Sequence, residues 1–79
     1  MLSPKQVVDE YYLDVRCKLL EIAAIMDRYD RAMARQPDPS STGDPRLAKC
    51  AQALTLLGDC QAQTNRAEQI ALIFSDPVT

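Results

Sequence analysis

Apolar side chains recur at helical spacing along the first half of the chain. They alternate four and three residues apart, which places them on one side of an α-helix, and we call this set the first seam. The first seam consists of Val8, Tyr12, Val15, Leu19, Ile22, Met26, Tyr29 and Met33. Ser3 and Gln6 have the spacing of a capping box, and Pro4 suits the first helical position. The pattern therefore predicts a helix over about 4–36.

The second half of the chain shows the same spacing with smaller side chains, and we call this set the second seam. The second seam consists of Cys50, Ala53, Leu57, Cys60, Thr64, Ala67, Ala71 and Phe74. Asp44 as a cap and Pro45 at the first position predict a helix over about 46–75. Gly58 lies inside it and costs a helix about 1 kcal/mol relative to alanine. The segment 37–45 holds three prolines and a glycine, which predicts a loop.

Folding the chain back at this loop sets the two seams antiparallel. Positions whose numbers sum to 82 or 83 then face each other, so that large side chains mostly meet small ones, as in well-packed cores. The predicted fold is all-α, with residues 1–79 forming a single domain that is an antiparallel helical hairpin of two long helices. Two such hairpins packed face to face would dimerise into a four-helix bundle.

The chain has more apolar residues than one two-helix seam can bury. Hydrophobic residues make up 47% of its 79 residues, and a chain of this size usually needs a disulfide, a metal or a partner for stability. Contiguous apolar surface that a hairpin leaves uncovered is typical of an interface. We therefore expect a homodimer or a complex with another protein. The predicted interface residues are Val7, Tyr11, Leu13, Leu20, Leu54, Ile70, Ile73 and Phe74.

Composition argues against several kinds of chemistry. The chain has no histidine, and its two glycines form no phosphate-binding motif, so we expect no metal and no cofactor. A net charge of −2 argues against nucleic acid as a partner, and no apolar run is long enough to predict a membrane span or a secretion signal. Three cysteines, an odd number, favour a reduced cytoplasmic protein. Cys50 and Cys60 are interpreted as small buried hydrophobic residues.

Two groups of charged residues on the first helix are candidates for binding. The acidic group is Glu10, Asp14 and Glu21. Carboxylate metal sites in four-helix bundles also need Glu-x-x-His on facing helices, so a solvated face is the better interpretation, with Asp14 paired to Lys18. The basic group, a candidate anion patch, is Arg28, Arg31 and Arg35. Neighbouring acids offset its charge, and Asp27 has the spacing of an ion pair with Arg31.

No residue set suggests a reaction, and the sequence resembles no family on which a function could be based. Catalysis by Cys17 would need an activating base or cation, and the sequence places only Glu21, Lys18 and Arg16 near it, which is a weak basis for a reactive thiol. The function that we expect is a non-catalytic protein–protein interaction or assembly module acting through apolar helix faces. The alternative is a small enzyme or ligand-binding bundle with a pocket formed between protomers, for instance around Glu10, Tyr11 and Arg66. An enzyme is the less favoured of the two.

Overall fold

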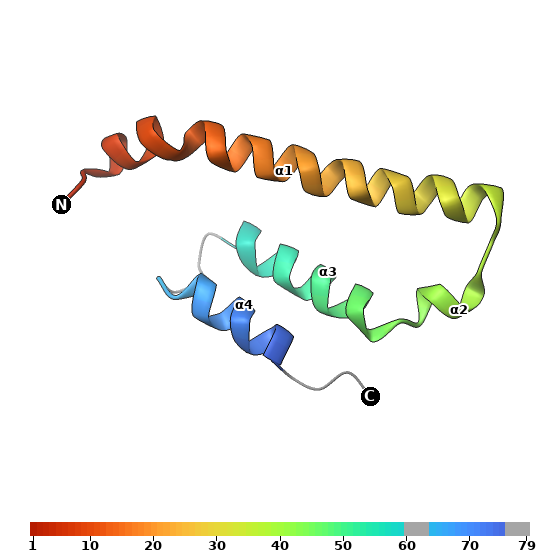
Figure 1. Cartoon of the computed structure of the whole chain (residues 1–79). Helices are drawn as coiled ribbons and strands as arrows, with labels where there is room; N and C mark the ends of the chain where they lie inside the picture. Colours follow the sequence, from red (N-terminus) through yellow and green to blue (C-terminus); the bar gives the residue numbers. More distant parts are fainter. Residues whose placement is uncertain (60–63, 76–79) are drawn as a thin grey trace. The chain divides into compact units, whose positions relative to one another are not determined.

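The computed structural model describes residues 1–59 and 64–75, and these ranges contain helices and no strand. The helices are α1 (Pro4–Arg35), α2 (Pro39–Thr42), α3 (Pro45–Gly58) and α4 (Arg66–Ser75) (Figure 1). The all-α fold class predicted from the sequence is therefore confirmed for the described residues. The chain divides into two compact units, an N-terminal unit of Met1–Pro37 and a C-terminal unit of Asp38–Thr79.

The N-terminal unit is a single uninterrupted helix that curves along its length (Figure 1). Its start has the capping box that the sequence predicts. The Gln6 backbone N–H donates to Ser3 Oγ at 3.2 Å, and the Ser3 N–H donates to Gln6 Oε1 at 2.7 Å. These bonds satisfy donors that a helix start otherwise leaves free, which is worth about 1 kcal/mol. α1 ends at Arg35, within one residue of the predicted boundary.

The predicted loop 37–45 contains one turn of helix, α2, which the sequence analysis does not foresee. Asp38 caps it, because its Oδ1 accepts a hydrogen bond from the Ser40 N–H at 3.1 Å. Proline at the first helical position follows this cap, an arrangement that favours a helix start. The same two features recur at α3, where Asp44 is the cap and Pro45 the first residue.

The prediction of one continuous helix over about 46–75 is wrong, because α3 ends at Gly58. Asp59 follows in an extended conformation, with φ −83° and ψ 108°. Glycine is a poor helix former and costs about 1 kcal/mol relative to alanine, which weakens the helix at this point. The Arg66 side chain donates from Nη2 to the Asp59 carbonyl oxygen at 2.7 Å, which satisfies a backbone acceptor beyond the helix end.

α3 and α4 lie side by side in the C-terminal unit (Figure 1). The Lys49 ammonium donates to the Ile73 carbonyl oxygen at 3.2 Å. In one straight helix these residues would lie roughly 36 Å apart, at 1.5 Å for each of 24 steps. The second seam therefore does not lie along one helix, and Cys60 lies outside the described residues. A helical hairpin is present, but it is formed by α3 and α4.

The core of this α3–α4 hairpin is small. Ala53 is 7% exposed and is the one buried residue of the described ranges. Leu54, Leu56, Ile70 and Ile73 around it are half-buried. A side chain as short as that of alanine allows two helices to approach closely. The packing of α1 on the second half of the chain, and the pairing of two chains into a four-helix bundle, stay predictions.

Candidate interaction surface

Large apolar side chains line α1 without being buried. None of its 32 residues, all of which are described, is buried. Ten large apolar side chains on it are 41% to 64% exposed. They are Val7, Val8, Tyr11, Tyr12, Leu13, Val15, Leu19, Leu20, Ile25 and Met26. We define the apolar face of α1 as the first seam together with the adjoining Val7, Tyr11 and Ile25. Eight of the ten lie on it, since only Leu13 and Leu20 fall elsewhere.

The eight predicted interface residues are divided between the two units. The four on α1 are exposed, and within that helix they form two pairs. Val7 and Tyr11, four residues apart, adjoin the first seam, whereas Leu13 and Leu20, seven apart, share another side. The structure therefore gives α1 two apolar sides, of which the one carrying the seam is the larger.

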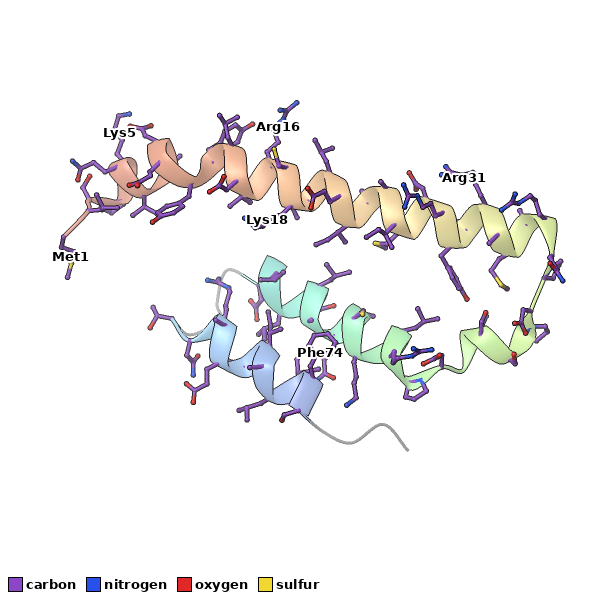
Figure 2. All side chains as sticks on the ribbon, in the orientation of Figure 1. Met1, Lys5, Arg16, Lys18, Arg31 and Phe74 are labelled. Carbon is purple, nitrogen blue, oxygen red and sulfur yellow. The ribbon has the colours of Figure 1, made fainter. Side chains whose placement is uncertain are left out.

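The other four predicted interface residues belong to the C-terminal unit. Leu54 on α3, and Ile70 and Ile73 on α4, are half-buried. Phe74, labelled in Figure 2, is 48% exposed at the last turn of α4. Ile73 lines a groove between α3 and α4, and Phe74 is the most exposed of the four.

A groove in the C-terminal unit is a feature that the sequence analysis missed. It has a volume of about 550 Å³. It is lined by Gln52, Thr55, Leu56, Asp59, Gln69, Leu72 and Ile73. Two of its polar groups already have local partners, because the Thr55 hydroxyl donates to the Ala51 carbonyl at 3.0 Å and the Gln69 amide donates to Asn65 Oδ1 at 2.6 Å. Residues from α3 and α4 meet there only because the chain turns after Gly58, so a continuous helix could not predict it.

The groove does not have the composition of a catalytic site. Asp59 is its one carboxylate, and the lining contains no lysine, cysteine or other nucleophile with a base beside it. Arg66 is half-buried, and its Nε lacks a hydrogen-bond partner, while its Nη2 holds the Asp59 carbonyl. The residues suggested for a pocket between protomers are divided, with Glu10 and Tyr11 in the N-terminal unit and Arg66 in the C-terminal one.

The candidate anion patch is an exposed row on α1. Arg28, Arg31 and Arg35 are all exposed, and their spacing of three and four residues places them on one side of the helix. Within the described ranges, neither Asp27 and Arg31 nor Asp14 and Lys18 form the ion pairs that the sequence predicts; these residues extend into solvent instead. The ion pair that α1 does form joins Lys5 Nζ to Asp9 Oδ2 at 3.1 Å (Lys5 is labelled in Figure 2).

Cysteines and acidic residues form no cluster in the part of the chain that the structure describes. Cys17 and Cys50 are free and exposed, so the interpretation of Cys50 as a buried residue is wrong, and Cys60 lies outside the described residues. Cys50 lies in the first half of α3, one helical turn before Ala53. In these ranges no group of three or more cysteine or acidic residues could hold a metal ion.

No helix of the described ranges is both long and apolar enough to cross a membrane. In comparisons with known proteins, no family model, curated protein or solved structure matches the chain. The exposed apolar face of α1 is the feature of the described residues that best indicates a function.

Proposed function

We propose that the chain is a non-catalytic protein–protein interaction or assembly module that acts through apolar helix faces. The observation that carries the proposal is the exposure of α1. Ten large apolar side chains along this helix, of the kinds that usually form protein cores, are 41% to 64% exposed. Soluble monomers rarely expose a contiguous apolar patch of more than a few hundred Å² unless it binds something.

The free energy available from this face is large for a small chain. Full burial of a Val, Leu, Ile or Met side chain is worth about 1.5–3 kcal/mol, so covering the exposed half of one is worth about 1 kcal/mol. Six such side chains and two tyrosines lie exposed on the apolar face of α1. Covering them would contribute on the order of 8 kcal/mol before the entropic cost of association, and a partner adds its own apolar surface.

The C-terminal unit is too short to cover this face with one helix. α1 has 32 residues and is roughly 48 Å long, whereas the 14 residues of α3 reach roughly 21 Å and the 10 residues of α4 roughly 15 Å. The break at Asp59 thus removes the long second helix that the hairpin prediction assigned to the first seam. A partner in trans with a helix as long as α1 would supply a surface that matches its full length.

The test compares Leu19→Glu, in the apolar face of α1, with Ala24→Glu on its polar side, where the same charge meets solvent. Amide hydrogen exchange is measured for the full chain over a range of dilutions, with the mass followed by light scattering. We expect the α1 amides of the dilute monomer to exchange fast, and Leu19→Glu but not Ala24→Glu to abolish any assembly. A monomer with protected α1 amides that Leu19→Glu unfolds throughout would overturn the proposal, because the face would then be core within one chain.

A further inference from the structure

We propose that the partner of the apolar face of α1 is α1 of a second copy. The two helices pack antiparallel, and their two-fold axis crosses α1 at the level of Ala23 and Ala24 along its length. This inference rests on the proposed function of α1 as an interaction helix. It goes further because it assigns the partner, the direction of packing and the residues that fix the register.

A row of charges follows one edge of the first seam. Each residue directly after Val8, Val15, Ile22 and Tyr29 lies on this edge, and we call these four residues the flanking row. The flanking row is Asp9, Arg16, Ala23 and Asp30, with charges of −1, +1, 0 and −1. In paired helices, such positions beside the apolar seam set the direction and register of packing through their charges.

Arg16 and Asp30 have no ionic partner within their own helix. Oppositely charged side chains on one helix pair when they are three or four residues apart, as Lys5 and Asp9 do. The neighbours of Arg16 at those spacings are tyrosine and leucine, and those of Asp30 are methionine, alanine and another aspartate. Both side chains are exposed, and neither forms an ion pair in the described ranges. Their charges are thus available to a second chain.

An antiparallel copy of α1 supplies the missing partners. In a two-fold pair centred near Ala23, residues whose numbers sum to 46 face each other along the flanking row. Arg16 of each copy then faces Asp30 of the other, which gives two identical ion pairs. The first seams of the two copies also interleave: a seam residue of one copy faces the seam residue of the other whose number brings the sum of the two to 48. The facing apolar pairs are Val15 with Met33, Leu19 with Tyr29, and Ile22 with Met26.

The other simple arrangements lack this complementarity. A shift of the antiparallel pair by one heptad places Asp9 opposite Asp30 and Arg16 opposite Ala23, so it replaces two attractions with two repulsions. A parallel pair in register sets the flanking row against the other edge of the seam, as in parallel coiled coils. There Arg16 meets Tyr11 and Asp30 meets Ile25. Of the three arrangements compared, the register centred near Ala23 is the one that joins opposite charges.

The test uses charge reversal in the full chain. R16D alone and D30R alone each convert two attractions into two repulsions. Each variant is therefore expected to self-associate about tenfold to thirtyfold more weakly than the wild type at low ionic strength. An equimolar mixture of the two variants is expected to recover wild-type affinity as a heterodimer, because each acid then faces a base. Because both chains in the mixture carry a substitution, recovery also shows that each of them folds.

Matched controls place the same charge changes away from the seam. R31D and E10R alter the charge of α1 by the same amounts on its polar side, and neither residue lies three or four positions from Arg16 or Asp30. We expect wild-type dissociation constants for both from sedimentation equilibrium (Arg16 and Arg31 are labelled in Figure 2). A dimer that R16D and D30R leave as tight as the wild type would overturn the antiparallel register. A wild-type monomer with fast-exchanging α1 amides would overturn the second copy as partner but leave the proposed function standing. A monomer with protected α1 amides would overturn both.

Discussion

The packing of α3 on α4 depends on the small side chain at Ala53, and Ala53→Leu tests it. Ala53 is 7% exposed, so three added carbon atoms have no free space to enter. Overpacking of this kind costs typically 1–3 kcal/mol. Ala51→Leu is the matched control, since Ala51 is exposed on the same helix and undergoes the same small change in helix propensity. Exposed substitutions usually stay within about 0.5 kcal/mol.

Native-state hydrogen exchange is the assay, because it reports the opening of each helix separately. A cost of about 2 kcal/mol raises the opening equilibrium of α3 and α4 roughly thirtyfold. The amides of both helices in Ala53→Leu should therefore exchange about thirtyfold faster than those of the wild type. Those of Ala51→Leu should change by about twofold or less. Equal exchange rates in the two variants would refute the packing of α4 over Ala53.

Three further predictions concern the ends of the helices. Gly58→Ala should stabilise α3 by up to about 1 kcal/mol in denaturant unfolding, because a Cβ there meets nothing within 4 Å and the glycine has no positive φ; destabilisation would contradict the open space. Ser3→Ala should cost about 1 kcal/mol and speed exchange in the first turn of α1, while the α3 amides stay unchanged. The side-chain and backbone hydrogen bonds of Arg46 lower the pKa of Asp44 from 3.8 to about 2. The stability that this pair gives to the start of α3 is therefore complete above pH 3.8 and lost as the pH falls through about 2; a carboxyl NMR titration with a midpoint near 3.8 would contradict it.

The helix starts are the features that the sequence predicts best, because each depends on residues close together in the chain. Ser3 with Gln6, and Asp44 with Pro45, cap α1 and α3 as expected. The regular spacing of apolar residues along α1 likewise depends only on residues within that helix, so it predicts the helix without knowledge of distant contacts. The helical character of the chain could therefore be predicted from local patterns alone.

The turn after Gly58 could not be predicted in the same way. A three-and-four spacing of small residues fits one long helix, and it fits equally well two short helices that happen to preserve the phase. What separates the two outcomes is a set of contacts between residues far apart in the sequence, including Lys49 with Ile73 and Arg66 with Asp59. A single glycine costs only about 1 kcal/mol in a helix, so its presence was too weak a signal to predict the turn. The groove between α3 and α4 was missed for the same reason.

The turn also changes what the apolar surplus of the chain means. With a second helix as long as the first, the first seam could be buried within one chain, and only residues off the seams would be left for a partner. With α3 and α4 folded on each other, Leu56 and Ile73 line the groove between them and are half-buried there. The side chains left over are then those of the first seam, on a helix more than twice as long as α3. A surface of that length is matched by another α1, and Arg16 and Asp30 supply the charges that would set two such helices antiparallel.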